Sequence, residues 1–168
     1  MPPGNEELTS DQIDLIVQWI DEGALPEGET VDISGCMDPN ASNYSAAATS
    51  DNGSCTYAVT FSVDMSNQSL GANDVVYANG EFNDWCGTCN PMAKNAGTDV
   101  WELTLFLAPG EYQYKFTVNG WDAEETIALG SSCDYLLGDE SANRGFLLET
   151  AALSLDTPCY SSCDACGN

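Results

Sequence analysis

The sequence predicts a mainly β protein, an antiparallel β-sandwich that follows one N-terminal amphipathic helix and a disulfide-closed loop. Short runs of alternating apolar and polar residues, separated by Gly, Asn and Pro, begin at Tyr57, and this pattern is typical of sandwich strands. Apolar residues recur at helical spacing near the N-terminus, and the 168 residues include eight cysteines, an even number typical of a disulfide framework. We therefore divide the chain into a helical leader and linker (1–33), a turn-rich spacer (34–56) and a β-sandwich module with a Cys-rich C-terminal tail (57–168).

The helix is expected to begin after Thr9 and to end near Gly23. Thr9 and Gln12 have the spacing of a capping box, in which each side chain bonds to the other residue's backbone. A glycine at the end of the periodic pattern is a common helix stop. The apolar residues that share one face of this helix are Ile13, Ile16, Val17 and Ile20. This apolar face needs a partner, because an isolated helix of this length is marginal in water.

Residues 1–24 (MPPGNEELTSDQIDLIVQWIDEGA) resemble the last helix of bacterial cytochrome c-like domains. In those domains the Met of an MPP motif is an axial haem ligand. The present chain has no Cys-x-x-Cys-His attachment motif, so we expect no haem. The segment is interpreted as the end of an upstream domain or, alternatively, as a capped surface helix.

Residues 24–33 lack periodicity and contain Pro and Gly, which predicts a linker. The following segment, residues 35–55 (GCMDPNASNYSAAATSDNGSC), is rich in turn-forming residues and is bounded by Cys36 and Cys55. We expect these two cysteines to be bonded to each other. The segment resembles short Cys-x-Asp-Pro-x-Ala-x-Asn-Tyr repeats of secreted proteins from marine Bacteroidetes, which implies a spacer between modules.

The same loop contains several side-chain oxygen atoms that suit a calcium ion. The candidate ligands are Asp38, Asn40, Asn43 and Asp51. Hard cations such as Ca²⁺ prefer carboxylate and amide oxygens, but these residues do not have the EF-hand spacing. The alternative is that they are solvated turn residues. No other cofactor is predicted.

Six short segments carry the strand pattern. Their apolar positions are Val59, Phe61 and Val63; Val75 to Ala78; Trp101, Leu103, Leu105 and Leu107; Tyr112, Tyr114, Phe116 and Val118; Phe146 to Leu148; and Ala152 to Leu155. The period assigns Trp101 to the core. The turn sequence Ala108-Pro109-Gly110 between two long alternating runs predicts a hairpin.

The charge balance restricts the partners. Asp and Glu number 27 and Lys and Arg number 3, for a formal net charge of −24. This field repels nucleic acids, anionic membranes and anionic polysaccharides, whereas neutral glycans are compatible with it. Because no run of eighteen apolar residues is present, we expect no membrane insertion.

The cysteines predict an oxidising compartment, so the protein is expected to be secreted or to lie at the cell surface. The first twenty residues lack the basic start and apolar centre of a signal peptide. An export signal is therefore expected upstream.

The strand region contains three motifs in a fixed order. They are residues 79–85 (NGEFNDW), 100–102 (VWE) and 107–121 (LAPGEYQYKFTVNGW). Together they resemble the glycogen- and starch-binding modules of immunoglobulin-like fold, including those of AMP-activated protein kinase β subunits, over about residues 57–155. The resemblance implies an immunoglobulin-like sandwich that binds glucan. It also implies that two tryptophans stack on glucose while a lysine and an asparagine donate hydrogen bonds; the matching residues are Trp85, Trp121, Lys115 and Asn143.

Elementary chemistry is consistent with this interpretation. A sugar ring has one comparatively apolar C–H face and a rim of hydroxyls, so its binding site needs an exposed aromatic plane with polar groups beside it. Trp85 and Trp121 both follow turn sequences, which predicts that they lie at the margin of the sheet. The alternative is that each is a core or turn residue, because tryptophan is usually mostly buried.

The chain departs from the family pattern in two places. Cys86 and Cys89 directly follow Trp85, and Gly120 runs into Trp121 without an intervening residue. With these features the sequence resembles modules attached to laminarinase-like glycoside hydrolases of marine bacteria. Both α-glucan and β-glucan are therefore expected targets, and attached catalytic or surface domains are expected partners.

The cysteines allow two interpretations. Cys86-x-x-Cys89 and Cys163-x-x-Cys166 have the spacing of a four-cysteine zinc site. Cys133 and Cys159 would then be left over, and an exported protein has oxidised thiols. We therefore expect all eight cysteines to form disulfides: Cys36, Cys55, Cys86, Cys89, Cys133, Cys159, Cys163 and Cys166. The spacing predicts no pairing beyond Cys36 with Cys55.

We expect no catalytic activity. The chain has no histidine, which removes the commonest general base. Glu124 and Glu125 are adjacent and would point in opposite directions in a strand, whereas a glycosidase needs two carboxyl groups at a defined separation. The alternative to glucan binding is a structural spacer or assembly module of an extracellular protein without a ligand.

Overall fold

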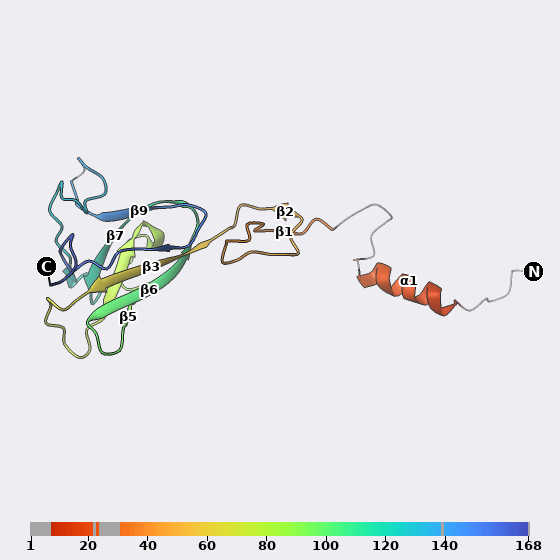
Figure 1. Cartoon of the computed structure of the whole chain (residues 1–168), viewed down its shortest axis with the longest axis horizontal. Helices are drawn as coiled ribbons and strands as arrows, with labels where there is room; N and C mark the ends of the chain where they lie inside the picture. The colour runs from red at the N-terminus through yellow and green to blue at the C-terminus, as the bar shows by residue number, and fades with distance from the viewer. Residues whose placement is uncertain (1–7, 22, 24–30, 139, 168) are drawn as a thin grey trace, which may run out of the picture.

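The computed structural model of the chain describes residues 8–21, 23, 31–138 and 140–167. Its elements are α1 (Ser10–Asp21), β1 (Ser34–Gly35), β2 (Ser50–Asp51), β3 (Tyr57–Asp64), β4 (Val76–Gly80), the 3-10 helix η1 (Glu81–Asn83), β5 (Ala93–Lys94), β6 (Val100–Leu107), β7 (Gly110–Val118), β8 (Ala123–Glu124), β9 (Arg144–Leu148) and β10 (Leu153–Ser154) (Figure 1). The predicted order, a helix followed by many short strands, is confirmed.

Two sheets pack face to face as a β-sandwich (Figure 1). The first sheet has the order β10-β3-β6-β5, and β3 and β6 pair along their whole length, from Tyr57 with Leu107 to Asp64 with Val100. In the second sheet, β4 and β8 flank β7, and β9 pairs with the first half of β7. The β7 strand is therefore the centre of the second sheet.

Phe61 of β3 lies at the centre of the core between the sheets. It is fully buried, and its ring contacts Tyr114 of β7 and Phe146 of β9, with centroids 5.1 and 5.7 Å apart. Val59 and Val63 flank it on the same face of β3 and are also fully buried. This alternation is the period-two pattern expected of a half-buried strand, so the predicted inward faces are confirmed.

The predicted hairpin at residues 108–110 is wrong. β6 ends at Leu107, which pairs with Tyr57 in the first sheet, and β7 begins at Gly110, which pairs with Leu148 in the second. The connection therefore crosses between the sheets. Alternation along a strand shows which side chains face inward, but it does not identify the strand's hydrogen-bonded neighbour.

Two pairings between the described strands are parallel. The short strand β10 pairs in parallel with β3, through Leu153 with Val59 and Ser154 with Thr60. Outside the sandwich, β1 and β2 also pair in parallel. Trp101 of β6 packs against the core as the period predicted, and its buried Nε1 has no hydrogen-bond partner among the described residues.

The helix α1 has the predicted capping box. The Thr9 N–H donates to Gln12 Oε1 at 2.9 Å, and the Gln12 N–H donates to Thr9 Oγ1 at 3.4 Å. The helix buries none of its residues, so its apolar face is exposed. The MPP motif and residues 24–30 of the predicted linker lie outside the described residues, and the origin of the helix in an upstream domain stays a prediction. No helix in the described part of the chain is long and apolar enough to cross a membrane.

The predicted bond between Cys36 and Cys55 is confirmed, with Cα atoms 4.9 Å apart. It closes the spacer around β1 and β2. The spacer is also joined to the sandwich, because the hydroxyl of Tyr57, the first residue of β3, donates a hydrogen bond to Asp38. Tyr57 is itself buried. The division of the chain at residues 33 and 56 stays a prediction.

Candidate functional site

Trp85 and Trp121 lie together on the outer side of the second sheet. Their ring centroids are 6.3 Å apart with an angle of 34° between the planes. The Trp121 Nε1–H donates to the backbone oxygen of Trp85 at 3.2 Å. Trp85 is partly buried and Trp121 is 45% exposed. The two rings form one partly exposed aromatic surface.

The turn before Trp85 is stabilised by hydrogen bonds among residues 80–85. The η1 helix follows β4 directly, and Asn83 Oδ1 accepts a hydrogen bond from the Gly80 N–H at 3.0 Å. Asp84 and Trp85 then adopt left-handed backbone conformations with φ of 52° and 55°. The Trp85 N–H donates back to the Gly80 oxygen at 3.0 Å. The chain thus reverses and lays residues 85–89, the tryptophan loop, over β4.

Asn79 holds the tryptophan loop on the sheet. Val76 and Ala78 of β4 face the core, so Asn79 faces outward, yet it is completely buried. Its Oδ1 accepts a hydrogen bond from the Gly87 N–H, and its Nδ2 donates to the Gly87 oxygen, both at 2.9 Å. Nδ2 also donates to Thr117 Oγ1 on β7 at 2.8 Å. A buried polar group left without a hydrogen-bond partner lowers stability, so these three hydrogen bonds of Asn79 hold the loop firmly on the sheet.

Trp121 packs against the same loop because Gly87 has no side chain. A Cβ at Gly87, where φ is 89°, would lie 2.9 Å from Trp121 Cδ1. On the other side, Asn119 and Gly120 make a left-handed turn with φ of 50° and 76°. Asn119 Nδ2 donates to Asp74 Oδ1 at 2.9 Å, and this bond is the main reason that the pKa of Asp74 is lowered.

Lys115 lies on β7 beside the tryptophan loop. Its neighbours Tyr114 and Phe116 face the core, so its side chain faces outward, and it pairs in register with Asn79. The Lys115 Nζ lies 3.2 Å from Glu124 Oε2, with 16% of the lysine side chain and 55% of the glutamate side chain exposed. The lysine is therefore held by one partner and retains further donor capacity.

Asn143 immediately precedes β9 and reaches toward β7. Its Nδ2 donates to Gln113 Oε1 at 3.1 Å. Gln113 precedes Lys115 by two residues, so both side chains face outward on the same strand. The structure thus places all four predicted ligand-binding residues on the outer side of the second sheet. We call this surface the tryptophan face; its members are Trp85, Trp121, Lys115, Asn143 and Gln113.

The Cys86-x-x-Cys89 pair closes the tryptophan loop as a disulfide with Cα atoms 5.9 Å apart. The zinc alternative is wrong, because Cys163 and Cys166 are bonded to Cys133 and Cys159 instead. All eight cysteines are therefore paired, as predicted.

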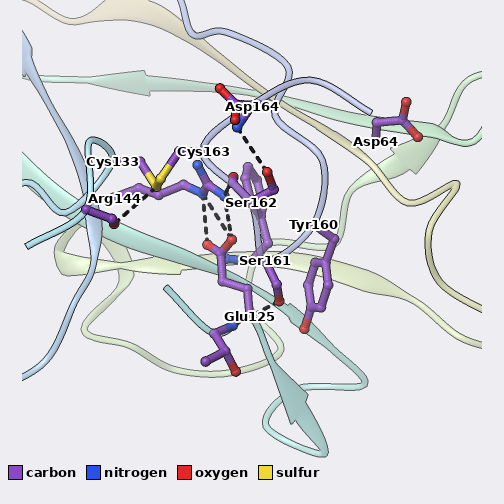
Figure 2. A network of polar contacts seen from close by, with 12 residues as sticks. Asp64, Glu125, Cys133, Arg144, Tyr160, Ser161, Ser162, Cys163 and Asp164 are labelled. Atoms are coloured by element: carbon purple, nitrogen blue, oxygen red, sulfur yellow. Dashed lines mark hydrogen bonds and ion pairs between the residues drawn. A yellow bond between two sulfur atoms is a disulfide. The ribbon is translucent and has the colours of Figure 1, made fainter. Parts of the chain in front are cut away.

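Glu125 and Arg144 form a buried ion pair behind the tryptophan face (Figure 2). Arg144 donates two hydrogen bonds to Glu125 Oε2, at 3.0 and 2.8 Å, and one to the Ser162 backbone oxygen at 2.7 Å. Glu125 Oε1 accepts a further bond from the Phe116 N–H at 2.9 Å. The exposed fractions of Glu125 and Arg144 are 1% and 5%. The pair ties β7 and β9 to the C-terminal tail.

The neighbouring Glu124 belongs to the outer surface and pairs with Lys115. The two adjacent glutamates therefore point in opposite directions, as their alternation predicted. Glu125 has a fixed cationic partner and little access to solvent. The two carboxyl groups do not flank a common cleft. Sequence analysis did not identify Arg144 as a partner, because residues 125 and 144 meet only through the fold.

Most of the predicted calcium ligands bond within the spacer. Asp38 accepts hydrogen bonds from the Asn40 N–H and the Tyr57 hydroxyl, Asn43 Oδ1 accepts one from the Thr56 N–H, and Asp51 Oδ1 accepts one from the Gly53 N–H. The bond from Tyr57 lowers the pKa of Asp38 and raises the pKa of Tyr57 to about 12. No group of three or more His, Cys, Asp or Glu residues in the described part of the chain can hold a metal ion. Calcium stays a prediction.

A cavity of about 250 Å³ lies beside β9 and the C-terminal tail. Its lining includes the Cys133–Cys163 disulfide, Arg144 and Asp156. None of the four predicted ligand-binding residues lines it. The tryptophan face is therefore not part of this cavity.

Part of the chain matches a known protein family. Residues 71–131 match the family model for carbohydrate-binding module 48, described as the isoamylase N-terminal domain. The matched region contains Trp85, Lys115 and Trp121 but ends before Asn143. No curated protein matches the chain. The match supports a carbohydrate-binding module of immunoglobulin-like fold. The cytochrome-like helix, the spacer repeat and the marine bacterial origin stay predictions.

Proposed function

We propose that this chain binds a neutral polysaccharide, an α- or β-glucan, by stacking sugar rings on Trp85 and Trp121. One observation carries the proposal: two tryptophans lie 6.3 Å apart on an outer sheet surface, and one of them is 45% exposed. Tryptophan is usually mostly buried, yet among the described residues neither ring belongs to the core cluster or packs against it. An exposed aromatic surface built on buried hydrogen bonds is suited to binding.

The chemistry of the tryptophan face fits a sugar chain. The indole surface suits the apolar C–H face of a glucose ring, and the groups beside it suit the hydroxyl rim. Lys115 and Asn143 are donors, and Gln113 and Glu124 add acceptor oxygens. Hydroxyls both donate and accept hydrogen bonds, so a mixed set of groups is appropriate. A neutral ligand is also compatible with the net charge of −24.

The binding is non-catalytic in this proposal. The match is to a binding module, and the adjacent Glu124 and Glu125 are separated by the sheet, one at the surface and one in a buried ion pair. The four disulfides support an oxidising compartment. We therefore infer a secreted or cell-surface protein in which this module directs attached domains to glucan.

The alternative of a spacer or assembly module without a ligand predicts a different surface. It would leave no aromatic plane accessible, with both tryptophans packed inside. The 45% exposure of Trp121 favours the binding function.

Affinity gel electrophoresis tests the proposal. The wild-type protein should migrate more slowly in gels that contain glycogen or laminarin, and its migration should not change in gels that contain alginate, an anionic polysaccharide. Trp121→Ala should migrate normally in all gels. Phe106→Ala is the matched control, because Phe106 is also an exposed aromatic residue, 61% exposed, but lies on β6 of the other sheet. Normal migration of the wild type with both neutral glucans would overturn the proposal.

A further inference from the structure

We propose that the tryptophan face continues across β7 to Tyr135, so that the site holds several successive sugar units of one glucan chain. This inference rests on the proposed function and deepens it: the ligand is an extended segment of polysaccharide and not a single terminal sugar. Neither the sequence motifs nor the matched family region points to Tyr135, which lies after residue 131.

The side chain of Tyr135 packs against β9 at a glycine. Arg144, Phe146 and Leu148 of β9 are buried, and Leu147 is 54% exposed. Gly145 therefore faces outward by alternation. A Cβ at Gly145 would lie 2.3 Å from Tyr135 Cγ and 2.5 Å from Cδ1. The absence of a side chain at residue 145 is what admits the ring, and Tyr135 remains partly exposed there.

The same strand pairing places Tyr135 beside the polar part of the tryptophan face. Gly145 pairs in register with Gln113 of β7, and Gln113 bonds to Asn143. Lys115 follows two residues later, and Thr117, which bonds to Asn79 under the tryptophan loop, follows two after that. A row of polar side chains thus runs along β7 between the two aromatic ends.

The length of this row indicates the size of the ligand. From Thr117 to Gln113 the strand advances four residues, about 14 Å at roughly 3.4 Å per residue. One glucose ring is too small to contact both ends. An oligosaccharide can stack on the tryptophans at one end and on Tyr135 at the other, with its hydroxyls over Gln113 and Lys115.

Tyr135 is held in place by its own segment. Cys133, two residues earlier, is bonded to Cys163. The Gly130 N–H donates to Asp134 Oδ2 at 2.7 Å, and the Tyr135 N–H donates to the backbone oxygen of Asn143 at 2.9 Å. A ring fixed before binding loses little conformational entropy when the ligand arrives. Tyr135 is therefore preorganised in the same manner as the tryptophan pair.

Calorimetric titration with oligosaccharides of two lengths tests the inference. The probes are maltose with maltoheptaose, and laminaribiose with laminariheptaose. The wild type should bind the better heptasaccharide at least about tenfold more tightly than the matching disaccharide. Tyr135→Ala should weaken heptasaccharide binding by about three- to tenfold and leave disaccharide binding unchanged. Tyr135→Phe, which keeps the ring, should bind like the wild type.

The controls separate this inference from folding and from the proposed function. Tyr44→Ala removes an accessible tyrosine, 47% exposed, in the spacer, and should change neither affinity. A Tyr135→Ala variant that binds both lengths like the wild type would overturn the inference, as would equal loss at both lengths together with a lowered unfolding temperature. If the wild type binds no glucan of either length, the proposed function itself fails.

Discussion

Some residues at the tryptophan face are proposed to contact the ligand, and others hold those residues in position. Trp85 and Trp121 supply the aromatic surface, while Asn79 and Gly87 determine where that surface lies, through two hydrogen bonds and one close approach. Lys115 supplies a charged donor that already has Glu124 as a partner. A change at a tryptophan should therefore act on affinity, and a change at Asn79 should act on stability as well.

Replacing either tryptophan should weaken glucan binding strongly. Trp121→Ala and Trp85→Ala are each expected to lower affinity by more than about tenfold, because a lost stacking plane costs roughly 1–3 kcal/mol by analogy with other aromatic contacts. Lys115→Ala should cost less, since a hydrogen bond from Lys115 to the sugar replaces bonds that its Nζ already makes to Glu124 or to water, and only the net difference appears in affinity. Isothermal titration with maltoheptaose and laminariheptaose measures all three. Wild-type affinity in both tryptophan variants, with an intact fold, contradicts the assignment.

At the residue scale, the sequence predicts a position in the fold where the residue types and their immediate neighbours are enough to indicate it. The turn signals before Trp85 and Trp121 predict that these residues lie at the margin of the sheet. Both lie together on its outer side. Asn79 is visible in the sequence only as part of a motif. Its role depends on Gly87 and Thr117, and the contact with Thr117, 38 residues away, exists only once β4 and β7 have paired. Sequence analysis could not identify Tyr135 for the same reason, because its side chain packs against Gly145 of β9, a contact that forms only in the folded chain.

At the scale of elements, the tryptophan loop is fixed at several points. The Cys86–Cys89 disulfide closes it from within, the Asn79 side chain holds its centre, and Trp121 bonds to its first residue. The disulfide encloses only a few residues, so its effect on global stability should be small, about 2 kcal/mol from chain entropy. It also restrains the backbone next to Trp85, which directly precedes Cys86.

Removing this disulfide should therefore weaken binding as well as lower stability. The Cys86→Ser, Cys89→Ser double variant is expected to bind heptasaccharide about three- to tenfold more weakly, because the looser loop loses entropy on binding. The matched control is Cys36→Ser, Cys55→Ser, which opens the spacer and should leave affinity unchanged. Calorimetric titration and thermal unfolding of both variants provide the comparison. Equal affinities in wild type and the Cys86, Cys89 variant would show that the disulfide does not position the site.

The hydrogen bond between Tyr57 and Asp38 joins the spacer to the sandwich and makes that junction sensitive to acid. The bond holds the pKa of Asp38 below its ordinary value. A carboxyl group whose pKa is lowered in the folded state contributes stability above its unfolded pKa of about 4, and this contribution is lost as the pH falls through the folded pKa.

Tyr57→Phe should remove the main cause of this shift. The pKa of Asp38 is then expected to rise toward its ordinary value, because only the Asn40 N–H remains as a strong donor. The buried ring of residue 57 is retained, so the sandwich should stay folded. A carboxyl-detected NMR titration from about pH 6 to about pH 2 measures the pKa in both proteins. An unchanged Asp38 pKa would mean that the hydrogen bond does not form in solution.

Element boundaries were largely predictable, whereas element partners were not. The alternating runs at Val59, Phe61 and Val63 and at Tyr112 to Val118 correspond to β3 and β7. The turn at residues 108–110 suggested a hairpin, but the chain changes sheets there. Whether two alternating strands pair with each other or face each other depends on the other strands, which no local pattern contains.

At the scale of the whole molecule, charge and function are largely independent. The net charge of −24 belongs to a chain with only 3 basic residues. All three are in ion pairs, Lys94 with Asp99, Lys115 with Glu124 and Arg144 with Glu125. A neutral ligand experiences no net force from this field. The composition could therefore exclude nucleic acids as partners, but it could not identify glucan.

Glucan affinity should accordingly change little with salt. Between about 0.02 and 1 M NaCl the screening length falls from roughly 20 Å to about 3 Å, which would abolish attraction between distant charges. We expect the dissociation constant for the better heptasaccharide to change by less than about twofold, because stacking and neutral hydrogen bonds are not screened. Titration at the two salt concentrations gives the answer. A tenfold change would indicate a charged ligand or a bound cation instead.

The four tryptophans allow the central claim to be tested in one experiment. Each indole N–H gives a separate ¹⁵N-correlated NMR signal, and Trp→Phe variants assign the signals of Trp19, Trp85, Trp101 and Trp121. Trp19 is exposed on α1 and Trp101 packs against the core, so both serve as internal references. On titration with maltoheptaose or laminariheptaose, the signals of Trp85 and Trp121 should shift together to saturation while the other two stay in place. Shifts at Trp19 alone, or saturable binding that moves neither Trp85 nor Trp121, would contradict the account.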